Sequence, residues 1–188
     1  MRPLAKVGMT PNMLTVLGVL GNAGAGYLAS EGEFLFAGIV VLIASALDMF
    51  DGALARATGQ ATPFGAVFDA TLDRISEAAV LFGLLVFYSD RGEQTESLLI
   101  FAAIVGSILV SYVRARAEVI GLTLKEGAFT RFERVALVGL GLIAHEVSGE
   151  NVMTYVLWAL AVLASFTALQ RLAMVWVKTR GEGQGTGK

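Results

Sequence analysis

Asp48–Asp73 reads DMFDGALARATGQATPFGAVFDATLD and contains four aspartates, in two pairs that each border a long apolar segment. Asp48 and Asp51 are spaced i,i+3, and Asp69 and Asp73 are spaced i,i+4, so each pair shares one face of a helix. A glycine and a proline between the pairs predict a break in the helix. We therefore expect the second helix to fold back antiparallel to the first, which brings both pairs of carboxylates to one depth.

The chain has the composition of an integral membrane protein. Of its 188 residues, 55% are hydrophobic and 16% are charged, and its mean hydropathy of +0.69 exceeds that of ordinary soluble domains. A membrane span needs about 20 mostly apolar residues. The expected fold is all-α with six transmembrane helices, at about 12–29, 34–48, 65–88, 97–119, 132–144 and 152–177. Close helix packing is predicted by the glycines of the first span, which are Gly18, Gly21, Gly24 and Gly26.

The six spans are expected to form one domain over residues 1–178, followed by a disordered polar tail at 179–188. Arg2–Gly8 precedes the first span and is interpreted as a short juxtamembrane helix at the headgroups, with a frayed terminus as an equal alternative. No signal-peptide pattern opens the chain, so we expect these residues to remain in the mature protein.

Basic residues mark one side of the predicted membrane domain. Both termini and the loops after the second and fourth spans share that side, and of the 14 Lys and Arg residues only Arg91 falls on the other. An excess of Lys and Arg is typical of cytoplasmic loops. The sequence therefore predicts a multi-pass plasma-membrane protein whose two termini lie on the cytoplasmic side. The aspartate stretch, which is the expected active site, lies on the same side.

The four aspartates predict a metal site. Carboxylates this close would repel one another and would be costly to ionise at a membrane, so divalent cations are their natural counter-ions. The chain has no cysteine and one histidine, and oxygen ligands alone favour Mg²⁺ or Mn²⁺ over zinc. Mg²⁺ keeps several waters, so four carboxylates favour two ions. The plainer alternative is that the carboxylates are solvated by headgroups or pair with Arg56 and Arg74.

The same stretch has groups that suit a phosphate ligand. Gly52 directly follows Asp51, and Gly65 opens the next helix, so neither position has a Cβ that would block close approach. Arg56 lies four residues past Gly52 and can clamp phosphate oxygens. These residues predict that the substrate carries phosphate.

The complete pattern D-x2-D-G-x2-A-R-x8-G-x3-D-x3-D resembles the signature of the CDP-alcohol phosphotransferases. It is matched at Asp48, Asp51, Gly52, Ala55, Arg56, Gly65, Asp69 and Asp73. The resemblance implies Mg²⁺-dependent transfer of a phosphatidyl-type group from a CDP-linked lipid to an alcohol, with release of CMP. It also implies that the four aspartates hold two metals and that Asp73 is the general base. Without a Ser, His or Cys arrangement for a covalent intermediate, direct attack on the β-phosphate is favoured.

The resemblance also assigns the residues that bind the donor. Gly52 and Arg56 would contact the CDP group, and Gly65, which allows close approach from the next helix, is a further candidate for binding the CDP-lipid. Pro11–Thr15 resembles the family's P-N-x-x-T, so Asn12 and Thr15 would touch the nucleotide, although a helix cap and a back-bonded threonine explain them equally well. Thr62 is a weaker candidate for the same pocket.

Four arginines are candidates for binding an anionic acceptor. Arg114 ends the fourth span, Arg131 and Arg134 open the fifth, and Arg171 lies near the end of the sixth, so three helices bring arginine to one level. This predicts a phosphorylated alcohol as acceptor. Each arginine also has an individual alternative: an i,i+4 pair of Arg114 with Glu118, the cytoplasmic charge bias, or snorkelling by Arg171.

Short local motifs point to one branch of the family. SYVRARAE at 111–118, RFER at 131–134 and QRL at 170–172 resemble the branch that makes phosphatidylinositol phosphate, or its archaeal ether-lipid counterpart, from inositol 1-phosphate. There Arg114, Arg134 and Arg171 would bind the inositol phosphate. Many members have lysine at the position of Arg114, which keeps the positive charge. Many also have proline at the position of Phe132, a difference that leaves both arginines of the second motif.

Two other functions remain open at this point. A sister enzyme would use glycerol 3-phosphate, which also needs cations. A cation transporter or channel would spread acidic residues through the depth of the membrane, whereas the central halves of the spans are interpreted as bare of carboxylates. The resemblance further suggests a homodimer embedded in membrane lipid, and no nucleic-acid partner is expected.

Overall fold

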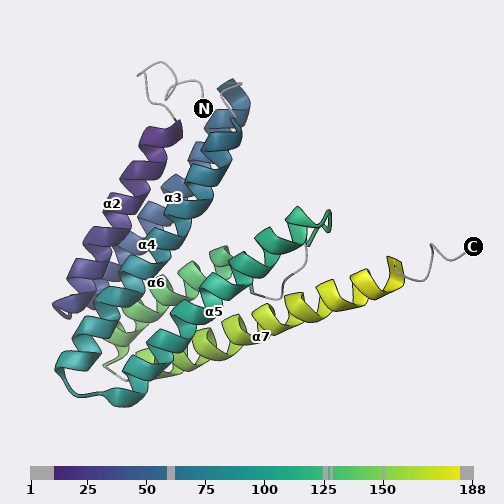
Figure 1. The fold of residues 1–188 in the computed structure, drawn as a ribbon. Helices are drawn as coiled ribbons and strands as arrows, with labels where there is room; N and C mark the ends of the chain where they lie inside the picture. Colours follow the sequence, from purple (N-terminus) through teal and green to yellow (C-terminus); the bar gives the residue numbers. More distant parts are fainter. Residues whose placement is uncertain (1–10, 59–61, 125–126, 128, 150, 183–188) are drawn as a thin grey trace, which may run out of the picture.

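The computed structural model describes residues 11–58, 62–124, 127, 129–149 and 151–182 (Figure 1). The ordered elements in these ranges are helices, namely α2 (Pro11–Ser30), α3 (Phe34–Thr58), α4 (Pro63–Asp90), α5 (Gln94–Val119), α6 (Arg131–Ser148) and α7 (Val152–Glu182). The all-α prediction is therefore confirmed for this part of the chain. The juxtamembrane helix expected at 2–8 lies outside the described residues.

The predicted break between the two aspartate pairs is confirmed. α3 ends at Thr58 and α4 begins at Pro63, where proline's missing N–H costs nothing in a first helical turn. The Thr62 hydroxyl caps α4 by accepting a hydrogen bond from the Gly65 N–H at 3.0 Å. α6 begins in a similar way, because Thr130 and Glu133 form a reciprocal capping box.

The helices form two packed groups that meet side by side. In the first group α2 packs against α3 and α4, and in the second α7 packs against α5 and α6. Contacts of α3 with α6 and of α4 with α5 join the two groups. Figure 1 shows the groups diverging toward the end of the bundle at which α3 ends, α4 begins and α5 ends. Since the chain alternates direction, the starts of α2, α4 and α6 share this end, which is also where the predicted site residues cluster.

Small residues allow the first group to pack closely. A Cβ on Gly83 of α4 would lie 1.9 Å from the Gly26 carbonyl oxygen of α2, so the two backbones touch directly. Gly21 likewise faces Ala44 of α3, whereas Gly24 has no neighbour within 4 Å. Gly18 also lies against α3, since its Cβ would be 1.9 Å from Asp48 Oδ1. Close packing predicted from the glycines of the first span is thus confirmed at Gly18, Gly21 and Gly26 and wrong at Gly24.

The outside of the bundle carries many large apolar side chains. Every helix exposes large hydrophobic side chains, including Leu20, Phe36, Phe82, Phe101, Leu140 and Trp158. Among the described residues, Asn12–Ser30, Gln94–Val119 and Val152–Arg180 are long and apolar enough to cross a membrane, and Phe34–Asp48 is a shorter apolar helix. Exposed apolar surface on this scale is typical of lipid contact, so this is a membrane protein.

α7 is longer than the sequence predicts. It continues to Glu182, so residues 179–182 of the expected disordered tail are helical. The Thr179 hydroxyl donates to the Val175 carbonyl at 3.0 Å, and the Arg180 guanidinium lies 4.0 Å from the centre of the Trp176 ring. These local contacts extend the helix through residues 179–182, whose polar composition alone indicates coil. Residues 183–188 lie outside the described part of the chain.

Candidate active site

Two carboxylates from facing helices meet at one guanidinium. Arg131, the first residue of α6, donates from Nη2 to Asp48 Oδ2 of α3 at 2.8 Å. Its Nη1 lies 2.9 Å from Asp73 Oδ1 of α4. The Asp48 and Asp73 side chains are only 5% and 19% exposed. The structure therefore brings together one member of each predicted aspartate pair, at the end of the bundle where the two helix groups diverge.

The other two aspartates flank this pair. Asp69 lies one turn before Asp73 on α4, and the charges of Asp69 and Asp48 both act on Asp73. Asp51 lies one turn after Asp48 on α3, but the side chains of Asp51 and Arg56 and the surroundings of Gly52 are outside the described set. Within that set, no group of three or more metal-binding side chains is close enough to hold an ion.

The donor set nevertheless fits a hard divalent cation. The carboxylates of Asp48 and Asp73 converge on a single positive charge, which is the arrangement that a bound cation needs. A Cβ on Gly18 of α2 would lie 1.9 Å from Asp48 Oδ1, so this carboxylate fits only against a glycine. The ligands present are oxygens, which suit Mg²⁺ or Mn²⁺.

The residues predicted to bind the donor nucleotide lie at the same end. Asn12 is exposed on the first turn of α2, and Thr15 is buried one turn later. Thr62 and Gly65 lie at the start of α4, one turn before Asp69, and the Thr62 hydroxyl serves there as the helix cap. The structure thus gives Thr62 a structural role, and it brings the remaining donor candidates to the aspartate end of the bundle.

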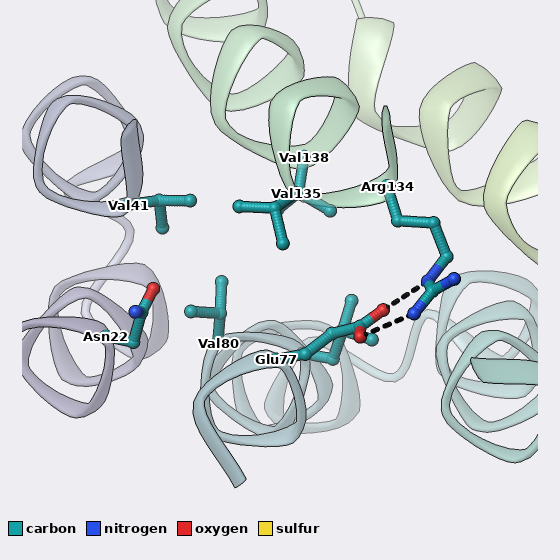
Figure 2. A pocket seen from close by; sticks show the side chains of 8 residues that line it. Asn22, Val41, Glu77, Val80, Arg134, Val135 and Val138 are labelled. Atoms are coloured by element: carbon teal, nitrogen blue, oxygen red, sulfur yellow. Dashed lines mark hydrogen bonds and ion pairs between the residues drawn. The ribbon is translucent and has the colours of Figure 1, made fainter. Parts of the chain in front are cut away.

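Arg134 is buried in an ion pair that sequence reasoning missed. Its Nε and Nη2 donate to Glu77 Oε1 and Oε2 at 2.6 and 2.8 Å (Figure 2). Its Nη1 donates to the Phe129 carbonyl at 3.3 Å. The Ser107 hydroxyl of α5 donates to Glu77 Oε1 at 2.9 Å. Glu77 is a carboxylate midway along α4 whose side chain is 10% exposed, so the interpretation that the central halves of the spans lack carboxylates is wrong. The sequence signal that could have revealed Glu77 is its i,i+4 spacing from Asp73, which places both carboxylates on one face of the helix.

The cavity beside this ion pair is too small for a substrate. It has a volume of about 10 Å³ and lies between Asn22 of α2, the Glu77–Arg134 pair and a wall of valines from α3, α4 and α6 (Figure 2). Such a volume holds at most about one water molecule. A larger hollow of about 500 Å³ lies at the opposite end of the bundle, where its lining of Ser89, Gly92, Gln94, Ser97 and Leu98 has no charged side chain. Neither space is an acceptor pocket.

Arg171 is a buried cation held by backbone. Its side chain on α7 donates from Nη1 to the Val110 carbonyl of α5 at 2.9 Å, and a Cβ on Gly127 would lie 2.7 Å from its Nη2. Arg171 is 6% exposed and forms no ion pair with a carboxylate among the described residues. The charges of Arg114 and Arg134 both act on it. A buried guanidinium in a cationic surrounding is costly without an anion.

Arg114 differs from the other arginines in its exposure. It pairs with Glu118 at 3.0 Å, and both side chains are about half exposed, which is the alternative that the sequence offered. Such surface pairs contribute little, roughly 0–1 kcal/mol. The structure therefore brings together the charges of Arg114, Arg134 and Arg171, and it joins Arg131 to the aspartates.

Comparisons with known proteins identify the family. The family model for CDP-alcohol phosphatidyltransferases matches residues 8–177. An archaetidylinositol phosphate synthase from Pyrococcus horikoshii is 36% identical over 175 residues, which cover 92% of this chain and 90% of that protein. A phosphatidylinositol phosphate synthase from Mycobacterium tuberculosis is 39% identical over 183 residues, which cover 93% of this chain and 83% of that protein.

Solved structures agree with the family match. A crystal structure of the Mycobacterium tuberculosis phosphatidylinositol phosphate synthase with CDP-DAG bound has a TM-score of 0.86 at 36% identity, covering 93% of this chain and 90% of that one. The same enzyme in complex with manganese and citrate has a TM-score of 0.84 at 36% identity, covering 93% and 86%. Sequence, fold and the convergence of aspartates thus lead to one conclusion: this chain belongs to the CDP-alcohol phosphatidyltransferase family.

Proposed function

We propose that the protein transfers the phosphatidyl or archaetidyl group of a CDP-linked lipid to inositol 1-phosphate, releasing CMP, in phospholipid biosynthesis. The observation that carries the choice of a phosphorylated acceptor is Arg171, a buried guanidinium that lies in the field of two other arginines and has no carboxylate partner among the described residues. The names of the relatives, which act in inositol-lipid synthesis, support inositol phosphate in particular.

Asp48, Asp51, Asp69 and Asp73 are the proposed ligands of two Mg²⁺ ions, for which Mn²⁺ can substitute. The relative solved with manganese supports a divalent metal. When bound, the ions would supply positive charge to the pyrophosphate of the donor and to the departing CMP oxygen. The proposed contacts of the CDP-lipid are Asn12, Thr15, Gly52, Arg56, Thr62 and Gly65. Gly52, Arg56 and Gly65 belong to the family signature, and Asn12 and Thr15 belong to the P-N-x-x-T motif.

Asp73 is the proposed general base. It would take the proton from the acceptor hydroxyl while the hydroxyl oxygen bonds to the β-phosphorus and the bond from phosphorus to the CMP oxygen breaks. Its position suits the task, since the carboxylate is 19% exposed and is oriented by Arg131. Arg114, Arg131, Arg134 and Arg171 would bind the acceptor phosphate, which holds the hydroxyl in line for attack.

The membrane arrangement proposed here is six spans with both termini and the active site in the cytoplasm of a plasma-membrane homodimer. Exposed apolar side chains on all six helices support six spans. The cytoplasmic orientation follows from the basic residues at the end of the bundle that carries the aspartates.

The proposal is tested by supplying purified protein with CDP-diacylglycerol, Mg²⁺ and one acceptor at a time, and measuring CMP release. Inositol 1-phosphate should give rapid release, whereas unphosphorylated inositol, which has nothing for the arginines to bind, should not. Release with glycerol 3-phosphate alone would overturn the acceptor assignment. No CMP release with any alcohol would overturn the transferase function and would favour the alternative of a cation transporter or channel.

A further inference from the structure

We propose that Glu77 is a positioning residue of the acceptor site: it fixes the orientation of the Arg134 guanidinium, which is a proposed ligand of the acceptor phosphate. The inference rests on the proposed function, and it assigns a role to a carboxylate outside the family signature. Glu77 is four residues beyond Asp73 on α4, and its side chain is 10% exposed.

The hydrogen bonds of Arg134 leave a defined set of donors. A guanidinium has five N–H groups, and three of them are used: Nε and Nη2 by Glu77, and Nη1 by the Phe129 carbonyl. One N–H remains on each terminal nitrogen. Glu77 occupies the edge formed by Nε and Nη2, so the N–H that remains on Nη2 lies on the edge that this nitrogen shares with Nη1. Glu77 thus fixes the orientation of the Arg134 guanidinium.

Two ion pairs connect α4 and α6 as consecutive rungs. Asp73 is bound by Arg131, and one turn further along both helices Glu77 is bound by Arg134. The Glu77–Arg134 rung is buried and is fixed from α5 by the Ser107 hydroxyl. Because both rungs share the same two helices, the second fixes the distance between the proposed base and the proposed phosphate ligand.

Glu77→Gln tests this role. Glutamine keeps the size of the side chain, but its amide nitrogen is a donor where Arg134 needs an acceptor, so one of the two hydrogen bonds is lost. The KM for the acceptor should rise about tenfold or more, while the KM for the CDP-lipid stays within about twofold. The comparison is made with whichever phosphorylated acceptor the wild type uses, so its outcome is separate from that of the acceptor assignment.

Glu96→Gln is the matched control. Glu96 is also a buried glutamate, but it lies at the opposite end of the bundle and accepts a hydrogen bond from Thr154 at 2.8 Å. Glutamine can keep that bond, and both KM values should stay unchanged. If both KM values of the Glu77→Gln variant stay at the wild-type level, or rise together, Glu77 is merely structural and the proposal is wrong.

Two further variants keep the proposal testable if Glu77→Gln does not fold. Ser107→Ala removes only the hydroxyl that orients Glu77, and it should raise the acceptor KM a few-fold; no change in a folded variant would contradict the proposal. In an Arg134→Gln background, which should itself raise the acceptor KM, adding Glu77→Gln should cause no further increase. A multiplicative increase there would show that Glu77 does not act through Arg134.

Discussion

Arg131 Nη1 lies 2.9 Å from Asp73 Oδ1, so the first residue of α6 holds the carboxylate that we propose as the base. The same guanidinium also binds Asp48 at 2.8 Å, and in this way a single positive charge joins three helices. One turn along α6, Arg134 binds Glu77. Acid–arginine pairs therefore set how α6, which carries two of the proposed acceptor ligands, lies against the aspartate helices.

Asp73→Asn should remove the proposed base without removing the side chain. The amide cannot take a proton from the acceptor, so turnover should fall by about 10²- to 10⁴-fold. Binding of CDP-lipid, measured by ligand-induced thermal stabilisation, should remain largely intact. A variant with near-normal CMP release would show that another group is the base.

Arg131→Gln should make the protein depend more strongly on metal for its stability. In wild type, Arg131 pairs with both Asp48 and Asp73 and offsets part of their combined negative charge. Without it the carboxylates repel one another, so adding Mg²⁺ to chelator-treated protein should raise Tm by a few degrees more than in wild type. Arg116→Gln, at an exposed position on α5, is the control. An equal Mg²⁺ response in all three proteins would contradict this role of Arg131.

Arg171→Gln should weaken binding of the acceptor more than Arg114→Gln does. Arg171 is buried and held by the Val110 carbonyl, whereas Arg114 is about half exposed and already paired with Glu118. Loss of a hydrogen bond from a buried cation to phosphate should raise the acceptor KM by about 10- to 100-fold. The exposed arginine should change it only a few-fold. The ranking would be refuted by equal effects of the two substitutions in initial-rate kinetics.

Gly26→Ala and Gly24→Ala should shift stability in opposite directions. A Cβ on Gly26 would lie 2.4 Å from the Ala79 carbonyl oxygen of α4, whereas one on Gly24 meets nothing within 4 Å. The first variant should lose about 2 kcal/mol, or roughly 4–8 °C in Tm. The second should gain up to about 1 kcal/mol from helix propensity. Thermal unfolding in detergent measures both, and a destabilised Gly24→Ala variant would contradict the packing described here.

Local sequence patterns predicted most of the fold and the family. The break between the aspartate pairs, the positions of the helices and the eight signature residues all depend on spacings within a short stretch of chain. The signature's assignment to the CDP-alcohol family is confirmed by the family match over residues 8–177. Such features are readable because helical periodicity and helix breakers act over a few residues.

Partners that are distant in the chain could not be predicted in the same way. Glu77 and Arg134 are 57 residues apart, and Arg131 is 83 residues from Asp48, so no local pattern connects them. Sequence reasoning grouped the four arginines by their level in the membrane, but it could not tell that Arg131 would bind aspartates. Which cation meets which carboxylate depends on how the helices rotate and pack, and that follows from the backbone approach of residues such as Gly26 and Gly83.

Mass spectrometry of the lipid product tests whether the protein transfers the lipid group to inositol 1-phosphate. Purified protein is given CDP-diacylglycerol and Mg²⁺ with equal concentrations of inositol 1-phosphate and glycerol 3-phosphate. The amount of CMP released is measured in the same reaction. We expect phosphatidylinositol phosphate as the main product, with one CMP released for each lipid formed. Phosphatidylglycerophosphate as the main product, or CMP release without a new phospholipid, would contradict it.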